Sequence, residues 1–306
     1  MTDVRPPTRD VFGLLLLDKP LGLSSNRALQ RAKRLYAADK AGHAGSLDPL
    51  ATGMLPIFFG AATRIAAFML EARKTYRVTA KLGSATTTGD AEGETIEDRQ
   101  GAAPPEPAVI AAAVNRFVGE IEQVPPMYSA LKRGGVPLYR LARSGVEVER
   151  SPRRVVIEAL VIERCEWPEL TLHVRCSKGT YVRTLVEDIA RAAGTLGHVA
   201  ALRRLAVSPF PEGAMRTLPE LEAAAAGGGV AALDQLLLSP DAALEGWPSA
   251  RLSPDEAARL AHGQPVAADP TWPCGHVKVY AESGRLIAIG VVTEERQLAP
   301  TRVFLR

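Results

Sequence analysis

The order of strand and helix patterns is the feature of this sequence that most constrains its fold. The patterns do not alternate strictly, as the repeated β-α-β units of a doubly wound sheet require. A mixed α+β fold is therefore expected. Its expected strands cover 11–17, 54–59, 75–82, 155–162, 170–176 and 202–207, and its expected helices cover 61–70, 108–118 and 182–193. A further helix starts at Ser24 or Ser25, with Arg27, Arg31 and Arg34 on the face opposite its apolar side.

A second, smaller unit begins near Trp247. Ser253 and Glu256 have the spacing of a capping box, and Gly263 follows the helix that it starts. Short strands are expected at 277–280, 286–292 and 302–305. The sequence thus predicts a flexible tail at 1–10, a large domain at 11–246 and a small β-rich domain at 247–306. The Ala- and Gly-rich segment 223–229 is expected to be weak structure or an insertion.

Composition favours an ordinary globular protein of the cytoplasm. The 306 residues are 46% hydrophobic and 23% charged, and apolar runs such as 14–17 are too short to cross a membrane. Three cysteines do not suggest a disulfide framework. Cys274 and His276 lie close together, but nothing nearby completes a metal site.

Charge is unevenly distributed along the chain. The formal net charge is only +3, whereas residues 132–154 hold seven Lys or Arg and two Glu, and residues 85–106 hold six acids and one base. Such polarity suits a basic face for phosphates, although solvated surface is the simpler explanation of charge alone. The long basic segment 124–154 contains paired prolines and paired glycines with a short helix near 138–143. Segments of this length are usually functional or disordered.

One loop concentrates features of a binding site. Residues 42–53 read GHAGSLDPLATG, and their glycines let a backbone approach a ligand closely. Asp48 before Pro49 is common in turns, and His43 alone is typical of a surface loop. Tyr76 opens an alternating strand, and Tyr181 and Arg183 stand where a strand meets a helix. Each of these signals is weak when taken singly.

Together, five segments resemble the TruB-type pseudouridine synthases. The resemblance runs from about residue 11 to residue 210, and its most specific part is the Asp48 loop, in which Ala44 stands where many relatives carry Thr. The C-terminal unit resembles a PUA-like RNA-binding module more weakly. The segments are LDKPLGLSS at 17–25, GHAGSLDPLATG at 42–53, RKTY at 73–76, MYSALK at 127–132 and CSKGTYVRT at 176–184.

The resemblance implies a fold, a reaction and a set of residues. The fold is a mixed, mainly antiparallel sheet with flanking helices, and segment 124–154 becomes a thumb that closes over RNA. The reaction isomerises uridine 55 in the T loop of tRNA after base flipping. Asp48 is the catalytic residue, without metal or other cofactor. Substrate-binding roles fall to Tyr76, Tyr181, Arg183 and Leu202, and His43 fills the space left by the flipped nucleotide.

Two other interpretations stay open at this point. The protein could be an RNA-binding and refolding module with little enzymatic role, although a pure binder has no need of Asp48, Tyr76 and Arg183 together. It could also resemble the guide-RNA-dependent synthases of archaeal and nuclear complexes. The small C-terminal unit and the lack of a long Lys-rich tail favour the stand-alone form. The resemblance then implies a monomer that binds the T-stem loop of tRNA, with no guide RNA, obligate protein partner or membrane.

Overall fold

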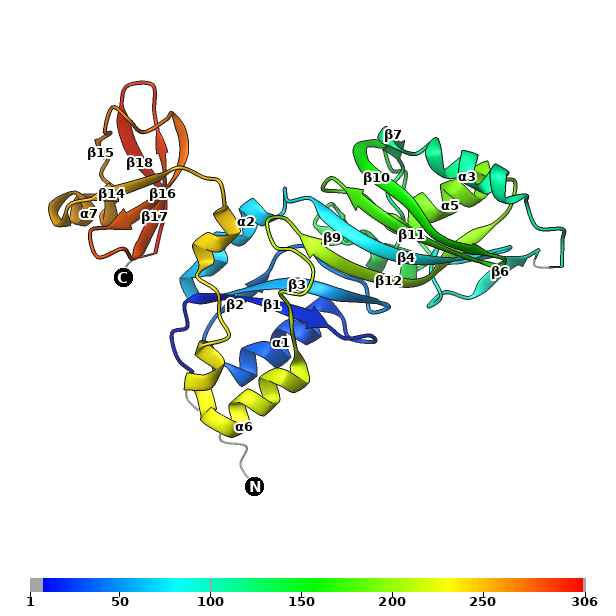
Figure 1. Ribbon diagram of the computed structural model, residues 1–306, viewed down its shortest axis with the longest axis horizontal. Coiled ribbons are helices and arrows are strands. Elements are labelled where there is room, and N and C mark those ends of the chain that lie inside the picture. Colours follow the sequence, from blue (N-terminus) through cyan, green and yellow to red (C-terminus); the bar gives the residue numbers. More distant parts are fainter. Residues whose placement is uncertain (1–7, 100, 305–306) are drawn as a thin grey trace.

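A large mixed sheet forms the body of the protein. The computed structural model describes residues 8–99 and 101–304, and within them this sheet has nine strands. Their order is β13-β1-β3-β12-β4-β11-β10-β7, with β2 beside β3 (Figure 1). The strands are β1 (Gly13–Lys19), β2 (Ala41–His43), β3 (Ala51–Phe59), β4 (Lys74–Leu82), β7 (Gly119–Gln123), β10 (Arg153–Glu166), β11 (Glu169–Cys176), β12 (Gly197–Val207) and β13 (Arg216–Thr217).

Most neighbouring strands of this sheet are antiparallel. Only the pairs β1–β13 and β3–β12 run parallel. The α+β prediction with a mixed, mainly antiparallel sheet is therefore confirmed. The parallel pair of β3 and β12 sits at the centre, and it places the start of β3, which follows the Asp48 loop, beside Leu202 of β12. Sheet topology thus brings two distant candidate residues to one place.

Helices cover the sheet in two groups (Figure 1). Helices α3 (Pro107–Asn115) and α5 (Val182–Ala192) pack on the half formed by β4, β10, β11 and β12. Leu185, Val186 and Ile189 of α5 recur at helical spacing and are buried in one apolar cluster with the inward side chains of β4 and β11. Helices α1 (Ser25–Leu35) and α6 (Leu218–Asp234) pack on each other and against β1.

Two sequence predictions about helices are wrong. The helix expected at 61–70 is a 3₁₀ turn, η1 (Gly60–Arg64), followed by the short helix α2 (Ala66–Met69). The Thr63 hydroxyl donates to Gly60 O at 2.8 Å, a local bond that competes with the α-helical ladder. Segment 223–229, expected to be weak, lies inside α6. A capping box at Thr217 and Glu220 starts α6, its alanines favour helix, and the kink is confined to Gly229.

Other expected boundaries shift by a few residues. The strand expected at 11–17 ends at Lys19, and the last strand, β18, covers Gln297–Val303 rather than 302–305. Residue 305 lies outside the described residues, as do residues 1–7 of the expected tail. Arg9, within that expected tail, donates to Tyr36 O and forms an ion pair with Asp234.

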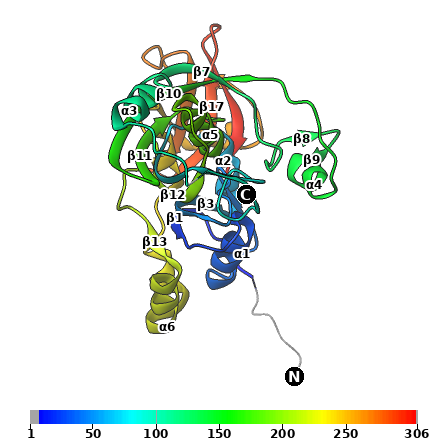
Figure 2. The same cartoon turned by 90° about the vertical axis from the view of Figure 1, so that its right-hand side faces the viewer.

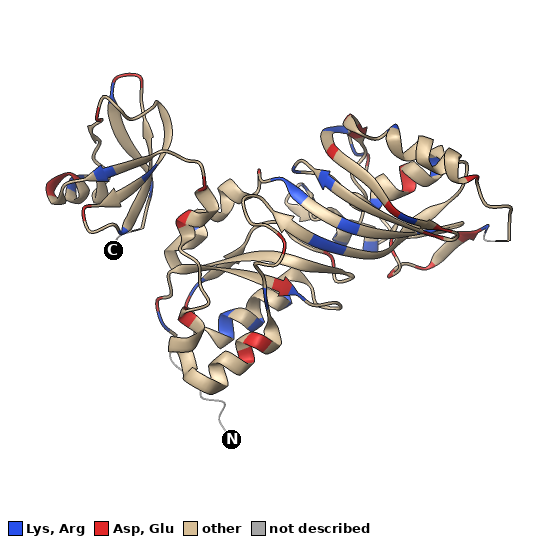
Figure 3. Ribbon diagram, viewed as in Figure 1, with Lys and Arg blue, Asp and Glu red and all other residues tan. Residues whose placement is uncertain are grey.

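The basic segment 124–154 forms a lobe of its own, which Figure 2 shows standing apart from the sheets. It contains the two-stranded pair β8 (Lys132–Arg133) and β9 (Val136–Pro137) and the helix α4 (Leu138–Arg143), which matches the expected short helix. The acidic segment after β4 forms the hairpin β5 (Ser84–Thr86) and β6 (Thr95–Asp98). Figure 3 shows basic positions crossing the central strands, where Arg77 of β4 pairs with Arg203 of β12.

A second sheet follows near the C-terminus. Tyr280 of its strand β16 (Gly275–Ala281) hydrogen-bonds Asp241 in the preceding 3₁₀ turn η2 (Pro240–Leu244). Leu286 and Ile289 of strand β17 (Leu286–Val292) share an apolar cluster with Phe58 of β3. No helix in the described ranges is long and apolar enough to span a membrane. The elements of this unit are β14 (Ser249–Leu252), α7 (Pro254–Ala261), β15 (Val266–Ala267), β16 (Gly275–Ala281), β17 (Leu286–Val292) and β18.

Candidate active site

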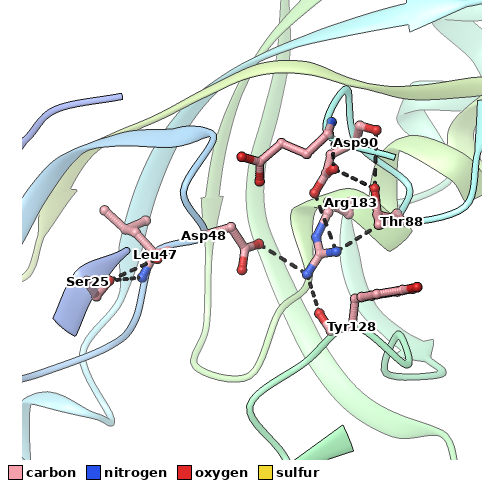
Figure 4. Close-up of polar contacts among 8 residues, drawn as sticks. Ser25, Leu47, Asp48, Thr88, Asp90, Tyr128 and Arg183 are labelled. Atoms are coloured by element: carbon pink, nitrogen blue, oxygen red, sulfur yellow. Dashed lines mark hydrogen bonds and ion pairs between the residues drawn. The ribbon is translucent and has the colours of Figure 1, made fainter. Parts of the chain in front are cut away.

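Asp48 lies in a short loop between β2 and β3, and hydrogen bonds with residues 19–25 fix this loop. The Ser25 hydroxyl at the start of α1 accepts from Leu47 N at 2.7 Å and donates to Leu47 O at 2.9 Å (Figure 4). Gly22 N donates to Pro49 O at 2.9 Å, and Lys19 Nζ reaches the same oxygen at 3.3 Å. The position of the Asp48 carboxylate is therefore set by α1 and by the segment before it.

A fully buried arginine links the start of the loop to β3. Arg204 of β12 donates from Nε to Met54 O at 2.6 Å and from Nη2 to Gly45 O at 2.9 Å. Gly53 has a φ of +96°, and a Cβ there would lie 2.1 Å from Arg204 O. Only glycine permits this approach between β3 and β12.

The loop opens into a cavity of about 320 Å³ that five of the six predicted site residues line. Tyr76 comes from β4, Leu202 from β12, and Tyr181 and Arg183 from the start of α5. These residues are far apart in sequence, and the strand order brings them together. Ser129 and Ala130, at the base of the lobe 124–154, close one side of the cavity.

Arg183 lies between two carboxylates (Figure 4). Its Nη2 is 3.1 Å from Asp48 Oδ2, and its Nη1 is 3.5 Å from Asp90 Oδ2. It also donates to Thr88 O at 2.8 Å and to Tyr128 O at 2.6 Å. With its guanidinium held by four partners, Arg183 presents one fixed nitrogen to Asp48 and so directs that carboxylate.

Burial and nearby arginine charges act in opposite directions on the pKa values of the titratable groups at the site. Burial raises the pKa of the Asp48 carboxyl, and the Arg183 guanidinium opposes this by lowering it. Since 47% of the Asp48 side chain is accessible, water moderates the effect of burial. Burial also raises the pKa of the Tyr76 and Tyr181 hydroxyls, and Arg204 acts against it at Tyr76. Both tyrosines are thus kept as neutral rings at ordinary pH.

His43 is the one predicted site residue that does not line this cavity. It ends β2, where it pairs with Ile57 of β3. Burial and the charge of Arg204 lower the pKa of its imidazole, so the neutral ring is favoured. Its Nδ1 is buried and has no hydrogen-bond partner among the described residues.

Several residues that shape the site were not predicted from the sequence. Asp90 is buried and accepts hydrogen bonds from Glu92 N and the Thr88 hydroxyl. Its segment is rich in acidic residues, which are typical of solvated surface, so the sequence did not predict this burial. Lys19 was recognised only as part of a motif, although its ammonium is fully buried and donates to three carbonyls. Lys74 and Arg204 line the cavity, and no periodicity marks them.

Models of known protein families match most of the chain. The family model TruB family pseudouridylate synthase (N terminal domain) matches residues 33–182. Models for the tRNA pseudouridylate synthase B C-terminal domain and for the C-terminal part of pseudouridine synthase II TruB match 183–245 and 248–304. Within residues 8–99 and 101–304, no group of three His, Cys, Asp or Glu could hold a metal ion.

Curated relatives match along the whole chain. The protein named tRNA pseudouridine synthase B of Pseudomonas aeruginosa (strain UCBPP-PA14) is 49% identical over 304 residues, which is 99% of each chain. That of Ectopseudomonas mendocina (strain ymp) is 49% identical over 305 residues, again 99% of each. A chain in the crystal structure of a Cbf5-Nop10-Gar1 complex shares the fold, with a TM-score of 0.73 and 24% identity over 96% of this chain and 85% of that one.

The fold and the full-length sequence matches together define the class of protein: a pseudouridine synthase, an isomerase that makes pseudouridine. More narrowly, the chain belongs to the TruB family of pseudouridylate synthases.

Proposed function

We propose that this protein isomerises uridine 55 in the T loop of tRNA to pseudouridine, with Asp48 as the catalytic residue. The observation that carries the proposal is the ion pair of Asp48 and Arg183 at the mouth of a cavity lined by Tyr76, Tyr181 and Leu202. Curated relatives named tRNA pseudouridine synthase B support tRNA as the substrate.

The reaction conserves every atom of the nucleotide. The bond from C1′ of the ribose to N1 of the uracil breaks, the uracil turns, and a bond forms from C1′ to C5. The proton on C5 leaves, and N1 gains one, so no oxidant, reductant or cofactor is needed. Asp48 acts as nucleophile or base in this sequence, a role that calls for an ionised and well-directed carboxylate.

The cavity is proposed to hold an everted uracil. A base in the T loop is stacked, and extruding it costs a few kcal/mol that contacts in the pocket must offset. Tyr76 stacks on the uracil, and Tyr181 and Leu202 complete the walls. His43 fills the space that the flipped nucleotide leaves, a role that suits its neutral ring.

RNA contacts outside the cavity complete the proposal. The segment 124–154 acts as a thumb over the T-stem loop, within a catalytic domain at 11–246, and the unit 247–306 is a PUA-like RNA-binding domain. We further propose a cytoplasmic monomer that needs neither guide RNA nor an obligate protein partner. The likeness to a chain of the Cbf5-Nop10-Gar1 complex supports the fold alone.

A single assay tests the function. Purified protein is incubated with an unmodified tRNA transcript, and pseudouridine is mapped by a carbodiimide-dependent stop of reverse transcription. We expect a stop at position 55 that disappears with Asp48→Asn and with a transcript carrying cytidine at that position. A stop elsewhere would refute the site specificity, and full activity of Asp48→Asn would refute the mechanism. Tight RNA binding without any stop would favour the RNA-refolding module instead.

A further inference from the structure

Two buried cations line the candidate active site on the side of β4 and β12. Lys74 is 8% exposed and Arg204 is 1% exposed, and both contribute to the cavity wall. Among the described residues, the Lys74 ammonium forms one hydrogen bond, from Nζ to Leu70 O at 2.9 Å, although it carries three N–H donors. Neither cation has a part in the Asp48 chemistry described above.

Neither cation has a counter-ion in the part of the chain that the structure describes. Throughout residues 8–99 and 101–304, no carboxylate lies within ion-pair distance of Lys74 or Arg204. Glu71 is close enough to influence Lys74, but its carboxylate is paired with Lys178. Burying an unpaired charge costs several kcal/mol, and buried charges are normally paired, so two such cations on a cavity wall favour an anionic ligand there.

The two cations converge on one point of the cavity. A Cβ placed on Gly45, at the start of the Asp48 loop, would lie 3.4 Å from Arg204 Nη1 and 3.9 Å from Lys74 Cε. The absence of a side chain at Gly45 therefore leaves the approach to both cations open. Arg183, on α5, is by contrast already occupied by Asp48 and Asp90.

A nucleotide in this cavity has one kind of group that matches a pair of cations. Uracil and ribose are neutral, whereas the phosphodiester linkages on either side of the nucleotide are anionic. Building on the function proposed above, we propose that Lys74 and Arg204 form a subsite for a backbone phosphate directly 5′ or 3′ of the everted uridine. Lys74 supplies free N–H donors, and Arg204 supplies fixed positive charge beside it.

The subsite explains how the cavity orients its substrate. With the phosphate at Lys74, the ribose is tethered at one end, and its C1′ can be presented to Asp48 while the base lies against Tyr76. Burial lowers the pKa of Lys74 to about 8, so the ammonium is mostly protonated at neutral pH and able to bind an anion. The other charged or titratable groups acting on it are Arg204, Cys176, Glu71 and Lys178.

The test pairs a protein change with an RNA change. Hairpin RNAs carry one neutral methylphosphonate linkage, 5′ or 3′ of the target uridine, and are compared with the all-phosphodiester hairpin. For the wild type we expect one linkage, but not the other, to weaken binding and single-turnover kcat/KM about tenfold, which corresponds to one charge-assisted contact. On the unmodified hairpin, Lys74→Met should lower binding and kcat/KM by the same factor. On the hairpin with the sensitive neutral linkage, the substitution should cause no further loss.

Lys81→Met is the matched control. Lys81 lies on the same strand as Lys74 but points to the opposite face, because its neighbours Ala80 and Leu82 face inward. It should leave both constants unchanged. Lys74→Met should also reduce the salt dependence of log Kd by about 0.7, the value for one phosphate of a single strand. The subsite would be overturned if Lys74→Met and a neutral linkage each caused a tenfold loss and the two losses multiplied when combined.

Folding and function are controlled separately. Replacing a buried unpaired ammonium by methionine is expected to keep or raise the melting temperature, so loss of binding cannot be ascribed to unfolding. If the wild type makes no pseudouridine on the unmodified hairpin, the proposed function fails. If it makes pseudouridine but no linkage is coupled to Lys74, only the phosphate subsite fails, and a role of both cations beside the Tyr76 hydroxyl is favoured.

Discussion

Arg183 Nη2 lies 3.1 Å from Asp48 Oδ2, and the rest of the guanidinium is fixed by Asp90, Thr88 O and Tyr128 O. The arginine is therefore a bridge between the Asp48 loop, the acidic segment after β4 and the base of the lobe 124–154. Its direction depends on three segments that are far apart in the sequence, so the position of the Asp48 carboxylate is sensitive to each of them.

Arg183→Lys should remove most turnover. Lysine keeps the charge but cannot satisfy four acceptors in fixed directions, so Asp48 is no longer held in its present orientation. Since a misplacement of about 1 Å can cost about 100-fold in rate, we expect a single-turnover loss of that order with little change in tRNA affinity. The same substitution at Arg191, an exposed residue of α5 paired with Asp188, is the control. A wild-type rate for Arg183→Lys would contradict this role.

Ser25→Ala should impair catalysis, although it removes only one hydroxyl group. The hydroxyl serves both the N–H and the C=O of Leu47, and its removal leaves two buried groups unpaired. We expect a loss of about 1–3 kcal/mol in unfolding free energy and a fall in kcat that exceeds any rise in KM, since the Asp48 loop shifts.

Ser24→Ala is the matched control for that prediction. Ser24 caps α1 by accepting from Arg27 N at 3.3 Å, and within the described residues its side chain has no hydrogen bond to the loop. Its loss should cost about 1 kcal/mol of stability and leave kcat unchanged. Equal kcat values for Ser24→Ala and Ser25→Ala would show that the loop does not depend on the Ser25 hydroxyl.

Gly53→Ala should be far more damaging than Gly22→Ala, although both glycines have positive φ. A Cβ on Gly53 meets the backbone of Arg204, whereas Gly22 has open space around it. We expect about 1 kcal/mol of destabilisation at Gly22, from conformation alone, and more than about 3 kcal/mol at Gly53, where β3 and β12 must separate. Urea unfolding of the two variants measures the difference, and similar values would contradict the close approach.

The sequence predicted the residues that line the cavity better than the buried residues that hold them in place. Asp48, Tyr76 and Arg183 lie in motifs of a recognisable family, and the strand order needed to unite them follows from that family. Asp90 and Lys19 were not predicted, because acidic runs and lysines are usually solvated and only the folded chain shows them buried. Their burial depends on contacts between segments that no local pattern reveals.

Errors in the fold prediction have equally local causes. The Ala- and Gly-rich segment of α6 was expected to be weak, but capping by Thr217 and burial of Leu221 and Leu233 outweigh its three glycines. The α2 region has helical apolar spacing, yet the Thr63 hydroxyl favours a tighter turn at its start. In both places, a few side-chain contacts decided between structures of similar intrinsic propensity.

Lys74→Met should change how stability depends on pH. The pKa of Lys74 is about 8 in the folded protein, below its ordinary value of 10.5. Below pH 8 the cost of burying the charge is present in full. Between these two values only the unfolded chain keeps the proton, so the unfolding free energy of the wild type rises with pH. The variant lacks this contribution.

We therefore expect Lys74→Met to be more stable than the wild type at pH 7, by up to about 3 kcal/mol, with the difference shrinking as the pH approaches 10. Urea unfolding of both proteins at several pH values gives the difference directly. A constant difference across this range would mean that Lys74 titrates as it does in the unfolded chain.

The lobe 124–154 should contribute to RNA binding through arginines that have no carboxylate partner. Arg140 and Arg143 of α4 are exposed, and within the described ranges neither forms an ion pair, whereas Arg154 is shared between Glu120 and Glu122. Replacing Arg140 and Arg143 by alanine should lower the slope of log Kd against log salt by about 0.7 to 0.9 for each phosphate that the protein no longer neutralises. Arg154→Ala, which removes a cation already neutralised, should leave the slope nearly unchanged. Equal slopes for all three proteins would show that α4 does not contact the RNA backbone.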